Sequence, residues 1–267
     1  FLRLKGIKKS FGSVQALSGV DLVIRKGEIH CLAGENGSGK STLIKVISGV
    51  HEATAGEIYI EGKKINKLDP IDMIHLGIQV IYQDFSIFPN LTVAKNIAVN
   101  RSLMTKSKKM NWKMARELAE EAMKKIGIEI DLDIMVERLT VAHKQIVAIC
   151  RAIINDVKLL ILDEPTTALT AKEIEYLYDI LRKLKEKGIA VLIVNHKLDE
   201  VYEIADYLTI IRNGMNVSSG PISEYDRMRF VKDLTGRSIM PDKHRPQDTT
   251  EEILRIEHLS RKGVFED

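Results

Sequence analysis

The chain has 267 residues, of which 45% are hydrophobic and 29% charged, and its formal net charge is +3 at pH 7. This length supports one large domain, or one domain with a lobe, around a full hydrophobic core. The small net charge gives no reason to expect a nucleic-acid or membrane-surface partner. No run of about 18 apolar residues occurs, so a membrane-spanning helix is not expected. The opening residues FLRLKGIKKSFG lack the long apolar stretch of a signal peptide.

The two cysteines, Cys31 and Cys150, lie inside apolar runs. A cysteine in such a run is typically a small core residue. We therefore expect two buried thiols rather than a disulfide, which suits a reducing cytosol.

The first thirty residues are predicted to form strands, because apolar residues cluster or alternate there between glycines, and further β segments follow up to residue 83. The segment EIHCLAG reads as a buried strand that runs through a glycine-rich loop into a helix. A later β segment turns at Glu61 and Gly62. The predicted β segments of this region are residues 2–7, 20–24, 28–34, 56–65 and 78–83.

From about residue 86 to 155 the pattern changes to helical. In the stretch 112–127, apolar residues recur at Met114, Leu118, Ala122 and Ile126, which favours a helix stripe. The strand pattern then returns with KLLILDEP, a nearly unbroken apolar run typical of a buried parallel strand. A helix at 173–188 and strands at 189–196 and 207–214 follow. The sequence thus predicts an α/β core with a helical subdomain inserted at about residues 86–155.

The C-terminal residues suggest a second unit. Residues 241–252, PDKHRPQDTTEE, are polar and contain prolines, which is typical of a linker. The following ILRIEHLSRKG resembles the N-terminal FLRLKGIKKSFG, although chance similarity of two strands is an alternative. Its position predicts one domain at 1–240, a linker at 241–252, and the start of a second, truncated copy at 253–267.

The strongest motif is GENGSGKS, which fits the phosphate-loop pattern G-x-x-x-x-G-K-[ST] between a predicted strand and helix. Such a loop binds anions through its backbone N–H groups and the positive end of the helix. Lys40 is expected to reach the β- and γ-phosphates, and Ser41 to ligate Mg²⁺. The candidate nucleotide-binding residues are Gly34, Glu35, Asn36, Gly37, Ser38, Gly39, Lys40, Ser41 and Thr42. A chance glycine-rich turn is the weaker interpretation.

Polar side chains also end three other predicted strands. Asp163 and Glu164 follow LLIL at the carboxyl edge of the sheet, where ligands bind. Asp163 is expected to hold the Mg²⁺ shell and Glu164 to polarise the attacking water as a general base. Gln83 could touch both metal and water, and His196 the γ-phosphate. Each would be an ordinary surface residue if it occurred alone, but their order and spacing favour a shared site.

The ordered set resembles the ATP-binding cassette (ABC) superfamily over essentially residues 1–235. The resemblance implies an α/β P-loop NTPase core with a mixed sheet, an N-terminal antiparallel β subdomain and an inserted helical subdomain. It implies ATP and Mg²⁺ as ligands, with Ser41, Gln83 and Asp163 around the metal. It also implies that Phe11 stacks on adenine, with a core or surface role as the alternative.

Two segments depart from the family pattern. Where the family has Leu-Ser-Gly-Gly-Gln, this chain has Leu139-Thr-Val-Ala-His143, and Val141 and Ala142 replace glycines that let the backbone approach a γ-phosphate. In the segment after Glu164, Thr170 replaces an aspartate. In a head-to-tail pair of cassettes, we expect this altered segment to make a weak cap for the partner's ATP site.

These departures look like one branch, the tandem ATPases of bacterial monosaccharide importers of the ribose, galactose and xylose type. That branch implies an ATP-hydrolysing subunit at the cytoplasmic face of the cell membrane that energises sugar import. The implied partners are a second cassette fused behind, transmembrane permease subunits and, indirectly, a sugar-binding protein, with no nucleic acid. The helix pattern around residues 86–155 is too short for the coiled coils usual in ABC ATPases that act on ribosomes or DNA. A phosphate-loop kinase would leave Gln83 and His196 unexplained.

An apolar cluster follows Gln83. Phe85, Ile87, Phe88 and Leu91 occur together in DFSIFPNLTV, more than a solvated strand end usually carries. We expect the groove beside Gln83 to receive a helix from a membrane subunit. Burial of these side chains under the helical lobe is the alternative.

Overall fold

The computed structural model describes residues 1–66, 69–84, 86–104, 112–237 and 255–261. Two sheets organise the described chain. The N-terminal sheet is antiparallel, with strand order β2-β1-β4-β5, and the main sheet has the order β10-β9-β3-β8-β7-β6. The N-terminal sheet comprises β1 (Leu2–Phe11), β2 (Val14–Ile24), β4 (Ala55–Ile60) and β5 (Lys63–Ile65).

The main sheet is mixed, because its strands from β9 to β6 are parallel and only β10 pairs antiparallel, with β9. Its members are β3 (Ile29–Ala33), β6 (Ile78–Ile81), β7 (Leu159–Asp163), β8 (Ala190–Val194), β9 (Tyr207–Arg212) and β10 (Met215–Pro221). Helix α1 (Lys40–Ile47) follows β3, α2 (Pro70–His75) precedes β6, and α6 (Ala171–Glu186) follows β7. After β8 and β10 come α7 (Leu198–Ile204) and α8 (Arg227–Thr235).

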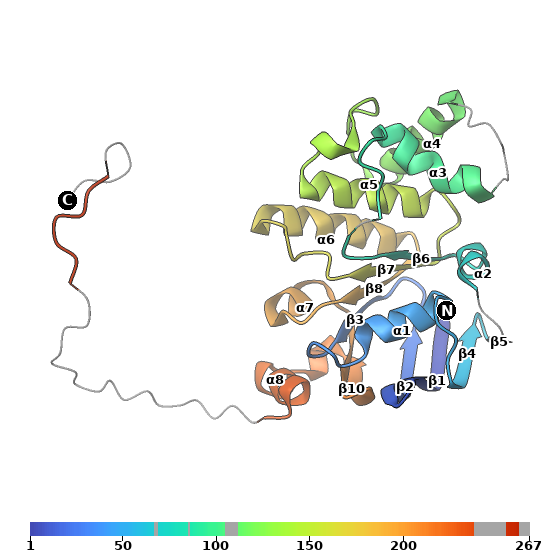
Figure 1. Cartoon of the computed structure of the whole chain (residues 1–267), viewed down its shortest axis with the longest axis vertical. Coiled ribbons are helices and arrows are strands. Elements are labelled where there is room, and N and C mark those ends of the chain that lie inside the picture. Colours follow the sequence, from blue (N-terminus) through green and yellow to red (C-terminus); the bar gives the residue numbers. More distant parts are fainter. Residues whose placement is uncertain (67–68, 85, 105–111, 238–254, 262–267) are drawn as a thin grey trace.

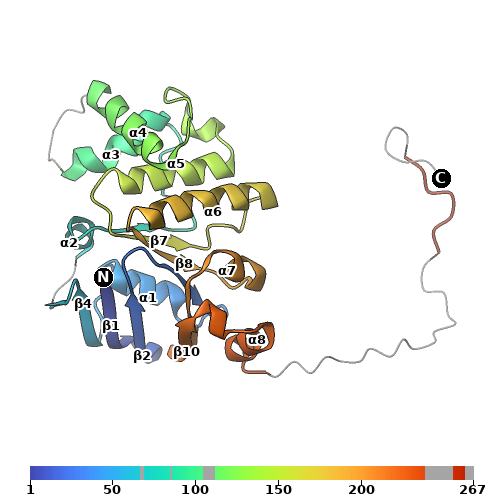
Figure 2. The same cartoon turned by 180° about the vertical axis from the view of Figure 1, so that it is seen from behind.

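Alternate residues of the central strands serve two different cores, which explains their unbroken apolar sequence. On β7, Leu159 and Ile161 pack with α1 and the N-terminal sheet, whereas Leu160 and Leu162 pack with α6 and the helices beyond it. Figures 1 and 2 show the result as layers, with the helical lobe and α6 on one side of the main sheet and α1 and the N-terminal sheet on the other. The carboxyl ends of the parallel strands lie between these layers.

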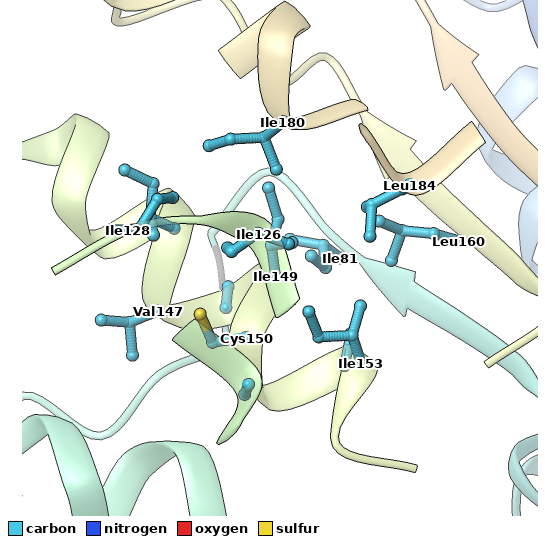
Figure 3. Close-up of a cluster of buried hydrophobic side chains, with 14 of the residues drawn as sticks. Ile81, Ile126, Ile128, Val147, Ile149, Cys150, Ile153, Leu160, Ile180 and Leu184 are labelled. Atoms are coloured by element: carbon cyan, nitrogen blue, oxygen red, sulfur yellow. The ribbon is translucent and has the colours of Figure 1, made fainter. Parts of the chain in front are cut away.

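The helical lobe comprises α3 (Val93–Met104), α4 (Trp112–Ile126) and α5 (Val141–Ile153), with a short 3-10 turn at Val136–Arg138. No strand of either sheet comes from the described residues between 86 and 155, where the only β contact is an isolated bridge between Thr92 and Met135. Figure 3 shows Ile126 and Ile128 meeting Ile149 and Cys150 of α5 and Leu160 of the sheet in one apolar cluster. The lobe is therefore joined to the core through α5, which packs on β6 and α6, and through the end of α4, which packs on α6.

The predicted fold class is confirmed: an α/β core with a mixed sheet, an N-terminal antiparallel sheet and an inserted helical lobe. The turn at Glu61 and Gly62 is also confirmed, and both residues have the positive φ that a two-residue hairpin turn needs. Both cysteines are buried and free, as expected. The predicted linker, residues 241–252, lies outside the described residues, so the domain boundaries stay predictions.

The apolar stripe predicted for α4 is wrong in part. Met114 is 47% exposed, and the buried face carries mainly small side chains. Those buried residues are Ala115, Ala119, Ala122, Met123 and Ile126. Alanines let α4 approach α3 and α5 closely, so burial follows the small residues rather than the largest ones.

Candidate functional site

The glycine-rich loop connects β3 to α1, and two of its glycines are required by close packing. A Cβ on Gly34 would lie 2.5 Å from the carbonyl oxygen of Ile211, and one on Gly39 would lie 2.8 Å from that of Ala16. Gly39 also has φ +105°, which side chains rarely adopt. The loop therefore lies directly against β9 and β2. Helix α1 starts at Lys40, and the N–H groups of its first turn have no acceptor within the helix.

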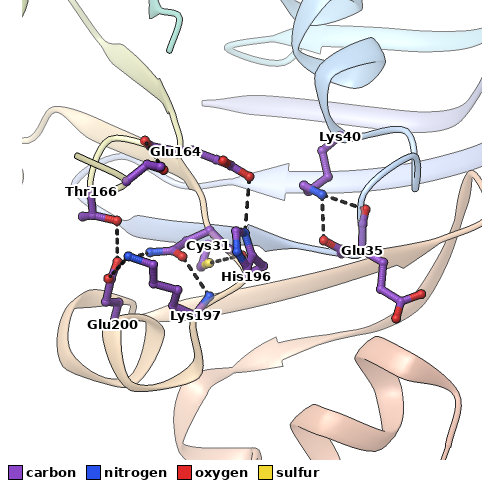
Figure 4. A network of polar contacts seen from close by, with 11 residues as sticks. Cys31, Glu35, Lys40, Glu164, Thr166, His196, Lys197 and Glu200 are labelled. Carbon is purple, nitrogen blue, oxygen red and sulfur yellow. Dashed lines mark hydrogen bonds and ion pairs between the residues drawn. The ribbon is translucent and has the colours of Figure 1, made fainter. Parts of the chain in front are cut away.

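The Lys40 side chain is folded back over this loop. Its ammonium donates to the carbonyl oxygens of Gly34 (2.6 Å) and Glu35 (2.9 Å), and Figure 4 shows Lys40 beside Glu35. Burial lowers the pKa of Lys40, and the nearby carboxylates of Glu164 and Asp163 oppose that change. Among the described residues, the buried Ser38 hydroxyl has no hydrogen-bond partner. Both polar groups are thus available to an anion that enters the loop.

Asp163 and Glu164 stand side by side where β7 ends. Burial, together with the adjacent Glu164, raises the pKa of Asp163, while Lys40 and Lys45 act in the opposite direction. Two carboxylates held this close favour a cation between them and an incoming phosphate. The oxygen donors of Ser41, Gln83 and Asp163 suit magnesium, which prefers hard oxygen ligands.

Glu164 has an unusual backbone conformation. Its φ is +47°, in the left-handed region that costs a non-glycine residue about 1–3 kcal/mol. Its N–H donates to the carbonyl oxygen of Val194 at 3.2 Å, so the end of β8 holds it in place. Its carboxylate Oε1 lies 3.3 Å from Nδ1 of His196. This strained backbone lies where Glu164, directly after β7, meets His196, two residues after β8.

One cleft of about 480 Å³ gathers most of the predicted site residues. It is lined by Ala16, Asn36, Gly37, Gly39, Lys40, Ser41, Thr42, Gln83, Asp163 and Glu164. Gly34, Glu35 and Ser38 belong to the same loop, and His196 joins the cleft through its contact with Glu164. Ala16 was missed by the sequence analysis, since nothing distinguishes an alanine in a strand until the loop packs on it.

Phe11 does not line this cleft. Its ring is 44% exposed at the end of the β1–β2 hairpin, 5.1 Å from the His51 ring and 5.0 Å from the Lys9 ammonium. Ala16, five residues further along the same hairpin, does line the cleft. Adenine stacking by Phe11 therefore stays a prediction.

The altered signature segment, residues 139–143, leads into the first turn of α5. Thr140 is the N-cap, and its hydroxyl accepts a hydrogen bond from the His143 N–H at 3.3 Å. Val141 is 38% exposed at the first position of the helix. Thr170, which stands where the family has an aspartate, caps α6 in a reciprocal box with Glu173. Both departures thus keep helix caps.

A second residue missed by the sequence analysis is Glu200, in the first turn of α7. Its carboxylate accepts hydrogen bonds from side chains on both sides of the site: Thr166, Tyr178, Asn195 and Lys197. An acidic residue early in a helix is common, so the sequence carried no signal for this role.

Comparison with known proteins agrees with this geometry. The family model described as ABC transporter matches residues 17–167. The ribose import ATP-binding protein RbsA 3 of Rubrobacter xylanophilus is 41% identical over 267 residues, which is 100% of this chain but 54% of that protein. The D-allose import ATP-binding protein AlsA of Escherichia coli is 41% identical over 269 residues, covering 100% and 52%. The chain thus spans about half the length of the curated relatives it matches.

Solved structures show the same fold. An ATP-binding cassette of an ABC transporter in its ADP conformation aligns with a TM-score of 0.74 at 29% identity, covering 86% of this chain and 93% of that one. A dimeric cassette in a post-hydrolysis state, bound to ADP and Pi, aligns with a TM-score of 0.71 at 29% identity, covering 83% and 99%. Within the part of the chain that the structure describes, no helix combines the length and the apolar character needed to cross a membrane.

Proposed function

Because this chain belongs to the ABC transporter family, we propose that it is an ATP-binding and ATP-hydrolysing cassette that energises the import of a monosaccharide. The observation that carries the proposal is the meeting of Lys40, Ser41 and Gln83 with Asp163 and Glu164 in one cleft. The relatives named for ribose and D-allose import support the substrate class.

In this proposal the loop binds the triphosphate. The Lys40 ammonium exchanges its carbonyl partners in the loop for the β- and γ-phosphates, and the first turn of α1 adds N–H groups at its positive end. Ser41, Gln83 and Asp163 hold Mg²⁺, which neutralises phosphate charge when bound. The raised pKa of Asp163 is consistent with this role, because a cation would relieve its unfavourable environment.

Glu164 acts on the water in the same proposal. Its carboxylate accepts the proton of the attacking water, and the imidazole of His196 orients that carboxylate and contacts the γ-phosphate. The two side chains arrive from different strands, so their approach depends on the parallel order β7-β8. Proton transfer to a positioned base typically contributes 10²–10⁴-fold in rate.

A second cassette is proposed to follow residue 252. The repeated pattern aligns Leu4 with Ile256, Gly6 with His258, and Ile7 with Leu259. Gly6 and His258 both have positive φ, +56° and +53°. Leu4 and Ile7 are 1% and 0% exposed, whereas Ile256 and Leu259 are 63% and 56% exposed. In this proposal, a second domain buries Ile256 and Leu259 in the way that the first domain buries Leu4 and Ile7.

The surface beside Gln83 is proposed to bind a helix of a permease subunit. Phe88 is 45% exposed, while Ile87 and Leu91 are partly buried, and Phe85 lies outside the described residues. The fully buried Asn96 holds the turn through two 2.8 Å hydrogen bonds, accepting from the Phe88 N–H and donating to its carbonyl oxygen. A rigid turn that presents an exposed aromatic ring suits a docking site.

The remaining partners and location follow from the same proposal. Permease subunits would hold the cassette at the cytoplasmic face of the membrane, and a separate binding protein would deliver the sugar to them. Nucleic acid has no place in the scheme.

Affinity purification of the intact chain from its native cells tests the function. Recovery with membrane subunits, together with MgATP binding and hydrolysis, is the expected result. Recovery with ribosomes or DNA would instead favour an ABC ATPase outside transport.

A further inference from the structure

Glu200 contacts the loops that carry Glu164 and His196, through Thr166 and Asn195. Helix α7 begins two residues after His196, and the Glu200 side chain in its first turn is only 14% exposed. Oε2 accepts hydrogen bonds from the Thr166 hydroxyl at 2.5 Å and from the Asn195 amide at 2.7 Å. The Tyr178 hydroxyl of α6 donates to the same oxygen at 3.4 Å. One carboxylate therefore contacts two loops and two helices.

The partners of Glu200 flank, in the sequence, Glu164, which is proposed to act on the water, and His196, which is proposed to orient the Glu164 carboxylate. Thr166 lies two positions after Glu164, and Asn195 lies immediately before His196. Lys197, immediately after His196, donates its ammonium to Oε1 of Glu200 at 2.8 Å. Its backbone N–H also donates to the Asn195 side-chain oxygen at 2.9 Å, which closes the short loop around His196. Figure 4 shows Glu200 joined to Thr166 on one side and to this loop on the other.

Because the partners of Glu200 are buried, losing their hydrogen bonds to its carboxylate would be costly. Thr166 is 2% exposed and Asn195 is 4% exposed, so water cannot readily replace the carboxylate. Burial by itself would raise the pKa of Glu200, yet the hydrogen bonds from Lys197, Thr166 and Asn195 together lower it. The group is thus held as a carboxylate, the form that accepts from all its partners at once.

We propose that Glu200 is a positioning residue for ATP hydrolysis, which sets the approach of Glu164 to His196 by bracing the loops that carry them. The inference rests on the proposed ATPase function. Glu200 itself does not line the cleft, so its effect should appear in the hydrolytic step and not in nucleotide binding. A displacement of about 1 Å at a reacting group can cost 10²-fold in rate.

The test compares Glu200→Gln with Glu203→Gln, the same chemical change at an exposed site on the same helix. Single-turnover hydrolysis and MgATP affinity are measured on the intact chain. We expect Glu200→Gln to slow hydrolysis about 10–100-fold with less than about a 2-fold change in affinity. Glu203→Gln should change neither. A wild-type rate in Glu200→Gln, or an equal loss of rate and affinity, would overturn the proposal.

A second pair of variants decides the matter if Glu200→Gln does not fold. Thr166→Ser keeps the hydroxyl that donates to Glu200, whereas Thr166→Val keeps the shape and loses it. We expect the serine variant to hydrolyse ATP at close to the wild-type rate and the valine variant to be about 10-fold slower. Equal rates in the two would refute the bracing role.

A wild-type chain that hydrolyses no ATP would count against the proposed function instead. Crystal structures of wild type and Thr166→Val then test the positioning directly. The proposal requires the Glu164–His196 contact, 3.3 Å here, to lengthen in the valine variant. An unchanged distance would reject it.

Discussion

Nδ1 of His196 lies 3.3 Å from Oε1 of Glu164, although the two residues follow different strands and are separated by a whole helix in the sequence. The contact exists because β7 and β8 are parallel neighbours, so that their carboxyl ends meet. Asp163, on β7, pairs in register with Val194 on β8. Glu164, one residue after β7, and His196, two residues after β8, are thus brought to the same edge of the sheet.

Variants at Lys40 and Glu164 should separate MgATP binding from ATP hydrolysis. We predict that Lys40→Ala abolishes tight MgATP binding, because its ammonium pairs with ground-state phosphate charge. Glu164→Gln should keep the affinity and slow hydrolysis about 10²–10⁴-fold. Equilibrium binding and single-turnover hydrolysis measure the two effects, with Lys63→Ala, on the exposed strand β5, as the control. Equal loss of binding in both variants would contradict the assignment.

The altered signature predicts a slow isolated chain. A homodimer would place Val141 and Ala142 over both ATP sites, whereas a fused partner with a glycine-containing signature would restore one site. A single lost phosphate contact can cost about 10²-fold in rate, so we expect steady-state ATPase to be slower by about that factor in this chain than in the full tandem protein.

A variant of the isolated chain tests the cause. Replacing Val141 and Ala142 together by glycine should raise its ATPase rate, since both residues stand in the first turn of α5. Val14→Gly, at an exposed hairpin position, is the control for nonspecific effects. If the unmodified chain is already as fast as the tandem protein, the asymmetric model fails.

A buried histidine should make the fold sensitive to mild acid. Burial lowers the pKa of His30 below its ordinary 6.5, against the opposing pull of Glu28, which lies 2.8 Å away. As pH falls below 6.5, the unfolded chain therefore binds a proton at His30, whereas His30 in the folded chain stays neutral to a lower pH. Stability is fully present above pH 6.5 and is lost as pH falls below it, by at most about 1.4 kcal/mol per pH unit.

Thermal unfolding from pH 7.5 to 5.5 measures this effect. We expect His30→Gln to be less stable at pH 7.5 but to show a flatter dependence on pH, whereas His75→Gln, at an exposed position, should keep the wild-type slope. A wild-type slope in His30→Gln would show that another group is responsible.

Glu28 contributes to the pH dependence of stability in a separate pH range. Burial would raise its pKa, but hydrogen bonds from His30 and Arg25 lower it below the usual 4.5, so its contribution is lost only in stronger acid.

The proposed docking surface around Phe88 can be mapped by cross-linking. We predict that Phe88→Cys, carrying a thiol-directed cross-linker, captures a membrane subunit, whereas Val14→Cys, which is 65% exposed on the N-terminal hairpin, does not. The native thiols give little background, because burial raises the pKa of Cys31 and that of Cys150 to about 12. Equal capture from both positions, or none from Phe88→Cys, would argue against this docking surface.

The sequence alone determined the phosphate loop, the acidic end of β7 and the alternation from strands to helices and back. These features are local, because a glycine pattern, an unbroken apolar run or a helical period is written in neighbouring residues. The fold class followed from their order. Their order did not reveal which side chains contact one another, and the prediction for the buried face of α4 was wrong at Met114.

Only the tertiary structure decided which distant residues meet. Ala16 became part of the cleft because Gly39 packs on its carbonyl oxygen, and Glu200 became a brace because α7 returns its carboxylate to Thr166. Neither residue type is unusual where it stands in the chain. Their roles arise from the order β3-β8-β7 in the sheet, which places loops distant in sequence side by side at one edge. Strand order is set by packing over the whole domain, so no single segment of the sequence could reveal it.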